Sequence, residues 1–194
     1  MSRQVSIVLL LSILSANSFS DWDRQISSRL EGSNKNILFD ISMETFSLVT
    51  PVIEWGSIYQ SWVEDRYSMN YEIATLGLFT TYSLVGITKY VIGRKRPARN
   101  YIPRLWNTRL TPSFPSGHTA SSAMWATTFL PNKQFLSLSY VALSAWSQVY
   151  VGNHYVSDVL SGAIVGSLIG KIMRSKYSKD LEGSLTSFNI QIRF

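Results

Sequence analysis

Both histidines of the chain stand beside residues that could give an imidazole a chemical role. His154 precedes Asp158 by four residues, a spacing that lets the two side chains face each other at the start of a helix. A carboxylate beside one ring nitrogen fixes the tautomer and leaves the other nitrogen free to act as a nucleophile. His118 follows Pro115, Ser116 and Gly117 at the start of an apolar segment. The alternative for each histidine is packing or a structural hydrogen bond.

The turn that precedes His118 has features of an anion-binding site. Ser116 and Gly117 lie at the predicted start of a helix, where free backbone N–H groups and the helix dipole favour negative charge. Gly117 also lets a ligand approach the backbone closely, because it has no side chain. The alternative for Ser116 is an ordinary helix N-cap.

Positive charge is concentrated just before this turn. The 194-residue chain has a formal net charge of +6, and Asp158 is the single acidic residue between Glu72 and Asp180. Basic residues between positions 89 and 109 are Lys89, Arg94, Lys95, Arg96, Arg99, Arg104 and Arg109. Such a cluster, with no carboxylate to neutralise it, attracts anions. A solvated loop or a nucleic-acid patch would share this pattern, but the apolar segments on both sides argue against a nucleic-acid partner.

The elements that must position these groups are predicted to be helices. Apolar segments lie near residues 38–56, 72–92, 119–130, 134–151 and 157–173, with turn signals between them. We therefore predict an all-α bundle of about five to six helices. If the helices alternate in direction, the basic cluster, the Ser-Gly-His turn and the His-Asp pair meet at one end. A hydrophobic content of 45%, six tryptophans and ten tyrosines favour a membrane-embedded bundle, although several segments are shorter than the ~20 residues of a span.

Two patterns near the C-terminus carry further structural predictions. Gly162, Gly166 and Gly170 recur every four residues and form a stripe that lets a neighbouring helix backbone come close. In residues 187–194, SFNIQIRF, apolar and polar side chains alternate, which predicts a short strand.

The N-terminal residues point to export. Residues 1–20 have a basic start, an apolar run and small residues up to Ser20, as in a secretory signal, and an uncleaved first membrane helix is the alternative. We assign residues 21–180 to one domain and residues 181–194 to a tail. There are no cysteines, and two histidines with one nearby carboxylate do not form a metal site, so we expect no metal and no cofactor.

Three motifs resemble those of the type 2 phosphatidic acid phosphatase (PAP2) family, which is related to the vanadium haloperoxidases. They are Lys89 with Arg96-Pro97 after six residues, then Pro115 to His118, then His154 with Asp158 after three residues. The resemblance covers roughly residues 70–173. It implies a metal-independent phosphatase that acts on a phosphomonoester or diphosphate of a lipid through a phosphohistidine. With the export signal and the apolar segments, we expect a location in the cytoplasmic membrane with the active site on the extracytoplasmic side, and the periplasm is the alternative.

The resemblance implies a role for each motif residue. His154 would attack phosphorus, Asp158 would orient His154, and His118 would protonate the leaving oxygen and then activate water. The phosphate would be bound by Lys89, Arg96, Ser116 and Gly117, with Gln148 as a further binding residue. These residue types suit the reaction, since hydrolysing a phosphate ester without a metal requires cations, a nucleophile and an acid.

The sequence departs from the family pattern at two positions. Gln148 follows Ser147 where the family has a Ser-Arg pair, so a neutral amide stands where an arginine is expected on the phosphate. Arg94, Lys95 or Arg99 are candidates to supply the missing charge. Val156 stands where a proline often follows His-Tyr, which reduces local rigidity.

Other functions remain open from the sequence. A soluble periplasmic acid phosphatase would use the same residues on small phosphoesters, and a vanadium haloperoxidase would hold vanadate on His154. A non-catalytic binder of anions or lipid phosphates is made possible by Gln148. Basic residues after the last apolar segment, in KIMRSKYSK, predict that this end lies in the cytoplasm.

Overall fold

The computed structural model describes residues 20–65, 69–105, 109 and 112–191. These residues form six helices and no strand: α2 (Ser20–Leu30), α3 (Ile37–Asp65), α4 (Met69–Ile92), α5 (Gly117–Phe129), α6 (Gln134–Tyr150) and α7 (Val156–Gln191). The predicted all-α class is therefore confirmed. Residues 93–116, between α4 and α5, contain no helix where they are described.

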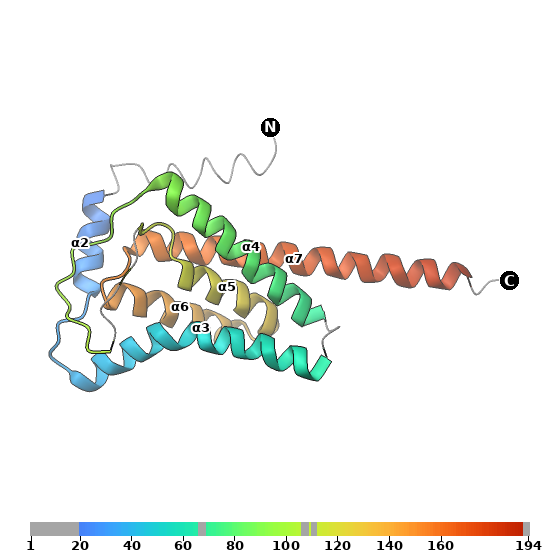
Figure 1. The fold of residues 1–194 in the computed structure, drawn as a ribbon, viewed down its shortest axis with the longest axis horizontal. Coiled ribbons are helices and arrows are strands. Elements are labelled where there is room, and N and C mark those ends of the chain that lie inside the picture. Colours follow the sequence, from blue (N-terminus) through green and yellow to red (C-terminus); the bar gives the residue numbers. More distant parts are fainter. Residues whose placement is uncertain (1–19, 66–68, 106–108, 110–111, 192–194) are drawn as a thin grey trace.

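Helix α5 is the centre of the bundle. It contacts α3, α4, α6 and α7, and α2 packs across one end against α6 and α7 (Figure 1). The main apolar core joins α4, α5 and α7, with Leu78, Met124 and Val165 among its buried side chains. The ends that face α2 are the C-terminal end of α4, the N-terminal end of α5 and the N-terminal end of α7. The predicted alternation of helix directions thus brings the three motifs to one end of the bundle.

The predicted glycine stripe forms the contact between α7 and α5. A Cβ atom at Gly166 would lie 1.9 Å from the Ala120 carbonyl oxygen, and one at Gly162 would lie 2.5 Å from the Ser116 carbonyl oxygen. Both distances are far inside van der Waals contact, and the neighbouring atoms belong to the backbone. Only glycine permits this approach, which seats the N-terminal turn of α5 directly on α7.

We expect Gly166→Ala to destabilise the fold strongly. The added methyl group overlaps the backbone of α5, so the two helices must separate, at a cost of about 3 kcal/mol in the free energy of unfolding. Gly56→Ala in α3 is the matched control, because its Cβ would meet no atom within 4 Å. That change should stabilise the helix by about 0.5–1 kcal/mol. Denaturant unfolding in detergent measures both, and equal effects of the two variants would contradict the packing.

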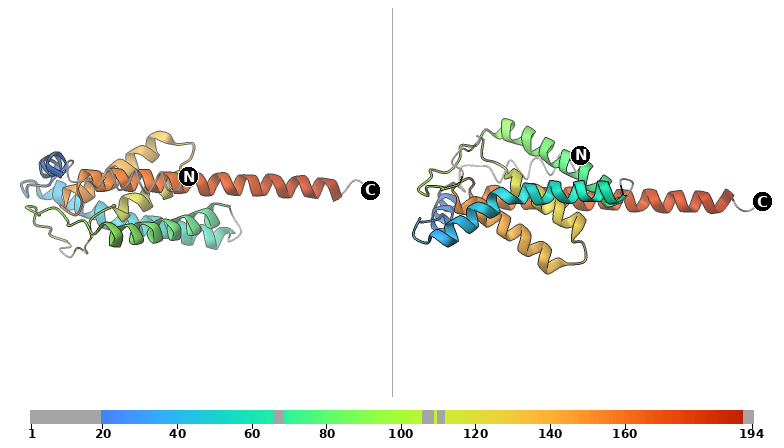
Figure 2. Two further views of the ribbon diagram at one scale, coloured as in Figure 1. Left: turned by 90° about the horizontal axis from the view of Figure 1, so that it is seen from above. Right: turned by 60° about the horizontal axis from the view of Figure 1, so that its bottom comes forward.

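Several predicted boundaries require correction. No helix is predicted near residue 25, yet α2 occupies Ser20–Leu30, with Asp21 and Asp23 in its first turn, where acidic residues favour a helix. Helix α7 continues through residue 181 to Gln191, so the strand predicted for the C-terminal residues is wrong as far as position 191. No proline interrupts that segment, and the helix extends well beyond the bundle (Figures 1 and 2). The predicted signal or first membrane helix, at residues 1–20, lies outside the described residues except for Ser20.

Candidate active site

The three motifs line one cavity. It has a volume of about 710 Å³ and lies where the C-terminal end of α4 and the N-terminal end of α5 meet the loop between α6 and α7. The sequence-predicted residues that line it are Lys89, Arg96, Gly117, His118, Gln148 and His154. Asp158 and Ser116 are fully buried behind this wall. The fold thus brings together residues that lie up to 69 positions apart in the sequence, from Lys89 to Asp158.

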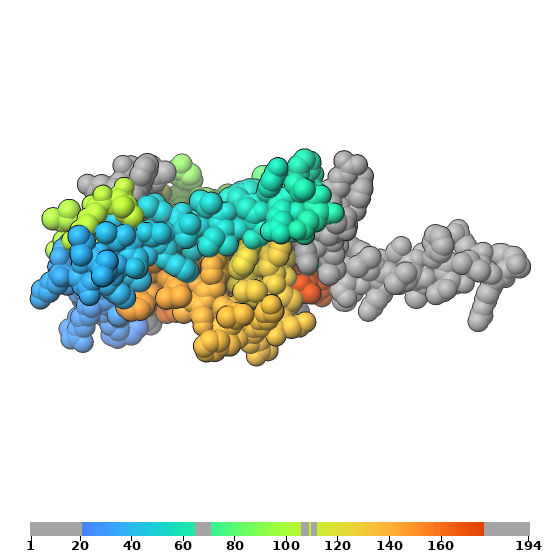
Figure 3. Space-filling view, turned by 90° about the horizontal axis from the view of Figure 1, so that it is seen from below, coloured from blue at the N-terminus to red at the C-terminus, as the bar shows by residue number. Residues whose placement is uncertain are grey.

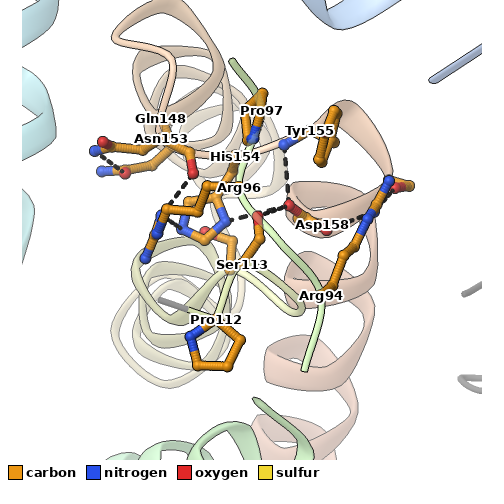
Figure 4. A network of polar contacts seen from close by, with 12 residues as sticks. Arg94, Arg96, Pro97, Pro112, Ser113, Gln148, Asn153, His154, Tyr155 and Asp158 are labelled. Carbon is orange, nitrogen blue, oxygen red and sulfur yellow. Dashed lines mark hydrogen bonds and ion pairs between the residues drawn. The ribbon is translucent and has the colours of Figure 1, made fainter. Parts of the chain in front are cut away.

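His154 is held between a carboxylate and a guanidinium. Its Nε2 atom lies 3.2 Å from Arg96 Nη1, and its Nδ1 atom lies 3.4 Å from Asp158 Oδ2 (Figure 4). A guanidinium can only donate, so Nε2 is the acceptor and the ring proton sits on Nδ1, facing Asp158. The Nδ1–Oδ2 separation is longer than a hydrogen bond, and catalytic contacts of this kind tighten when a substrate binds. The lone pair of Nε2 is directed at the cationic side of the cavity.

Asp158 is fixed from several directions. Its Oδ1 atom accepts from Arg94 Nη1 at 2.7 Å, and its Oδ2 atom accepts from the Tyr155 backbone N–H at 3.0 Å and from the Ser113 hydroxyl (Figure 4). These donors stabilise the ionised carboxylate. The carboxylate is therefore available as the fixed partner of His154.

Helix α2 contributes a residue that the sequence analysis did not identify. Asp23 is buried, and its Oδ2 atom accepts from Arg94 Nη2 at 2.6 Å. Its Oδ1 atom also accepts from the Ser157 backbone N–H at 3.0 Å, in the first turn of α7. Arg94 therefore bridges two buried carboxylates, Asp23 and Asp158, and ties α2 to the site. No spacing in the sequence relates Asp23 to residues 94 and 157.

The two motif cations are oriented by backbone carbonyls. Lys89 Nζ donates to the carbonyls of Pro112 at 2.9 Å and Ser113 at 3.0 Å, and Arg96 Nη1 donates to the carbonyl of Asn153 at 2.5 Å. Burial, and then the neighbouring Arg109, lower the pKa of Arg96 to about 10, so it remains charged at neutral pH. Both cations can bind an anion in the cavity.

In the turn at the start of α5, one residue caps the helix and the next two line the cavity. The Ser116 hydroxyl accepts from the Thr119 backbone N–H at 3.4 Å and caps the helix, as the alternative prediction for this serine states. Gly117 and His118 line the cavity. The first N–H groups of a helix have no acceptor within it, so the backbone here can donate to an anion.

Both imidazoles are expected to remain neutral at pH values well below the usual pKa of a histidine. Burial, and then the charges of Arg96 and Lys89, lower the pKa of His118 from 6.5 to about 4. Burial likewise lowers the pKa of His154 to about 4, against the opposing effect of Asp158. The native state thus binds fewer protons than the unfolded chain between pH 6.5 and 4, so the free energy of unfolding falls as the pH falls through this window.

NMR titration of the two imidazoles in the ligand-free protein measures this directly. Neither ring should titrate above about pH 5, whereas both should titrate near the ordinary value in denaturant. A midpoint near 6.5 for either ring in the folded protein would contradict the burial of the site.

Gln148 lines the cavity, but its amide is engaged by the protein. Its Nε2 atom donates to the Ser47 hydroxyl at 2.9 Å, and its Oε1 atom accepts from Asn153 Nδ2 at 3.0 Å. Of the cations expected to replace the missing charge, Arg94 is committed to two carboxylates, and Lys95 is exposed and outside the cavity wall. Arg99 does line the cavity.

The described residues offer no cluster of three or more histidine, aspartate or glutamate side chains that could hold a metal ion.

Comparison with known proteins places this site in a family. The model of the PAP2 superfamily matches residues 71–181. A decaprenylphosphoryl-5-phosphoribose phosphatase of Mycobacterium tuberculosis is 32% identical over 108 residues, in an alignment that covers 53% of this chain and 59% of the relative. A lipid A 1-phosphatase of Porphyromonas gingivalis is 29% identical over 145 residues, covering 60% of this chain and 29% of the relative. The match thus spans about three fifths of the mycobacterial relative and less than a third of the other.

Two solved structures share the fold. A transmembrane PAP2-type phosphatidylglycerolphosphate phosphatase from Bacillus subtilis superposes with a TM-score of 0.68 at 23% identity, covering 92% of this chain and 98% of that one. LpxE from Aquifex aeolicus superposes with a TM-score of 0.62 at 22% identity, covering 77% and 92%. The family model covers more than half of the chain and includes all three motifs, from Lys89 to Asp158. This chain belongs to the PAP2 superfamily.

Proposed function

We propose that the protein is a phosphatase that hydrolyses a phosphomonoester or diphosphate of a lipid, without a metal, through a phosphohistidine. The observation that carries the proposal is the placement of His154, with its Nδ1 atom facing Asp158 and its Nε2 atom facing Arg96 in a cationic cavity. A neutral imidazole in this position is both oriented and aimed at the place where an anion would bind.

The geometry supports a two-step reaction. The phosphoryl oxygens would be bound by Arg96, Lys89 and the backbone N–H groups at the start of α5, which offset their charge. His154 Nε2 would attack phosphorus and form a P–N bond, while the bond to the leaving oxygen breaks. His118 would donate a proton to that oxygen. Asp158 would stabilise the positive charge that develops on the His154 ring.

The second step regenerates the enzyme. His118, now neutral, would take a proton from water as the water oxygen attacks phosphorus, and the P–N bond would break to release inorganic phosphate and free His154. His118 is neutral in the ligand-free cavity, where burial lowers its pKa to about 4. A bound phosphate dianion raises the pKa of a nearby imidazole, so the proton required for the first step is taken up with the substrate.

The surface of the bundle supports a membrane location and a lipid substrate. Large apolar side chains are more than two thirds exposed on three helices, at Leu38, Phe79, Val91, Phe135 and Leu138. Helices α3 and α6 lie side by side on the face seen in Figure 3. One helix among the described residues, at Val156–Lys176, is long and apolar enough to cross a membrane. Such exposure is costly in water and favourable in a bilayer, which favours this proposal over a soluble acid phosphatase.

Orientation and substrate class follow from charge and from the relatives. Lys171, Arg174 and Lys176 lie on α7 far from the cavity end, and basic residues favour the cytoplasmic side, so the cavity would open on the extracytoplasmic side. The relatives named above as phosphatases of decaprenylphosphoryl-5-phosphoribose and of lipid A act on phosphorylated lipids. We propose the same class of substrate, a phosphorylated lipid, for this chain. We propose no nucleic-acid partner.

Phosphate release from a panel of lipid phosphates in detergent tests the function. We expect hydrolysis to be unchanged by EDTA and to be inhibited by vanadate, because a trigonal-bipyramidal vanadate bound to His154 resembles the transition state. Soluble phosphomonoesters in the same assay show whether the lipid portion contributes to kcat/KM. Activity that is lost on chelation and restored by Mg²⁺ or Zn²⁺ would contradict the proposed chemistry.

A further inference from the structure

The cavity wall contains two guanidinium groups that the three motifs do not include. Arg99 and Arg109 line the cavity together with Lys89 and Arg96. The charges of Arg109 and Arg99 lower the pKa of Arg96, after the larger effect of burial, so the three guanidinium groups lie close enough to repel one another. Cations are not gathered in this way for stability, because their mutual repulsion favours separation.

Glu44 is the one carboxylate among the described cavity-lining residues, and its charge and that of Glu31 raise the pKa of Arg99 against the larger lowering by burial and Arg109. Glu44 Oε2 accepts from the backbone N–H groups of Arg104 at 2.9 Å and Leu105 at 2.6 Å, and Glu44 Oε1 accepts from the Tyr101 hydroxyl. The Glu44 oxygens are thus occupied by the loop that precedes α5. Four cationic side chains and one carboxylate line the described part of the cavity, so its net charge favours an anionic ligand.

Arg99 is tethered to the position where the motif arginine is missing. Its Nη2 atom donates to Asn153 Oδ1 at 2.6 Å, and Asn153 Nδ2 donates to Gln148 Oε1 at 3.0 Å. The backbone carbonyl of Asn153 accepts from Arg96 Nη1 at 2.5 Å (Figure 4). Asn153 therefore holds the guanidinium groups of Arg96 and Arg99 next to each other, immediately before His154 in the chain.

The backbone at Gly152 makes room for this arrangement. Gly152 has a φ of +68°, which glycine adopts readily, and a Cβ atom there would lie 2.9 Å from Arg99 Cγ. Arg109 Nη1 donates to the Gly152 carbonyl and to the Pro97 carbonyl. The loop after α6 thus positions both additional guanidinium groups through its backbone and the side chain of Asn153.

We propose that Arg99 is a phosphate-binding residue that replaces the arginine absent at position 148, and that Gln148 is a positioning residue acting through Asn153. This inference rests on the proposed phosphatase function and adds the third cation for the reacting phosphoryl group. A neutral glutamine can accept from Asn153, whereas an arginine cannot. Glutamine at position 148 therefore holds Asn153, and Asn153 in turn holds Arg99.

The test compares four full-length proteins with wild type in detergent: Arg99→Gln, Gln148→Arg, the double variant, and Lys95→Gln as the matched loss of one charge outside the cavity. We expect Arg99→Gln to lower kcat/KM for a soluble phosphomonoester about 10- to 100-fold, since a hydrogen bond to a charged group is lost. It should weaken binding of inorganic phosphate, followed by tryptophan fluorescence, in the same proportion. Lys95→Gln should change neither.

Gln148→Arg tests whether Gln148 acts by holding Asn153 and Arg99 in place, or whether an added positive charge in the cavity is enough to raise activity. Alone it should lower kcat/KM, because it removes the acceptor for Asn153 and crowds Arg99. In the Arg99→Gln background it should restore much of the loss, because one guanidinium then takes the place of the other. Circular dichroism checks that each variant is folded.

The outcomes separate this inference from the proposed function. If Arg99→Gln matches Lys95→Gln in both assays while wild type is active and binds phosphate, Arg99 does not bind phosphate and the function stands. A loss confined to diphosphate substrates would also overturn the inference, because Arg99 would then bind a second anionic group. If wild type neither hydrolyses nor binds phosphate, both proposals are wrong.

Discussion

Replacing His154 with alanine is expected to reduce turnover of every phosphorylated substrate by about 10⁴-fold or more, because the change removes the proposed nucleophile. His154 is the only imidazole placed between a fixed carboxylate and a cation in the described part of the cavity. The measurement is phosphate release under saturating and subsaturating substrate. Helical content by circular dichroism should match wild type.

A second readout tests the covalent role itself. Wild type mixed rapidly with labelled substrate and quenched in base should retain label on the protein, since a phosphoramidate is stable in base and labile in acid. The His154→Ala protein should retain none. Activity within tenfold of wild type, or label that survives the substitution, would show that another residue or water attacks phosphorus.

Replacing His118 with alanine is expected to cost about 10²- to 10⁴-fold with a lipid or alkyl phosphate, the usual range for a lost general acid. The alkoxide leaving group is strongly basic and cannot depart without a proton. With p-nitrophenyl phosphate the first step should be nearly unaffected, because nitrophenolate needs no proton. His118 lies in the first turn of α5 and lines the same cavity as His154, which is why we propose it as the proton donor.

The two steps can be separated by rapid mixing. Because His118 is also proposed to activate water, the alanine variant should release a burst of nitrophenolate and then turn over slowly as the phosphohistidine accumulates. The wild type serves as the control, with a smaller burst and a faster steady state. Equal losses in the burst for good and poor leaving groups would sink the general-acid assignment.

The helices and their meeting point could be predicted from the sequence because they depend on local patterns. Apolar segments and turn residues separated the five helices α3 to α7, and alternation of helix direction placed the motif ends together. Gly162 and Gly166 predicted a close contact because small residues every four positions form a continuous stripe on a helix. Helix α2 was missed, since it is short and lies after an apparent export signal.

The distribution of the cations was decided by tertiary structure alone. Arg94, Lys95 and Arg99 lie within six positions in a segment with no periodic pattern, so nothing local distinguishes them. The fold pairs Arg94 with Asp23 from α2 and with Asp158, leaves Lys95 in solvent, and turns Arg99 toward Asn153. The directions of the Arg94 and Arg99 side chains depend on partners 54 to 71 positions away.

The same reason explains the remaining differences. Residue types and spacing predicted a site at His118, His154 and Asp158, because a short motif places its own members relative to one another, and their catalytic roles stay predictions. Whether Ser116 caps a helix or faces the cavity, and what Gln148 bonds to, depends on which segments pack against them. The sequence by itself therefore determined the chemical groups and the end of the bundle where they meet. Only the packing of α2 and of the two loops on that end decided which groups face the cavity and which support it, because side-chain orientation there is set by contacts distant in sequence.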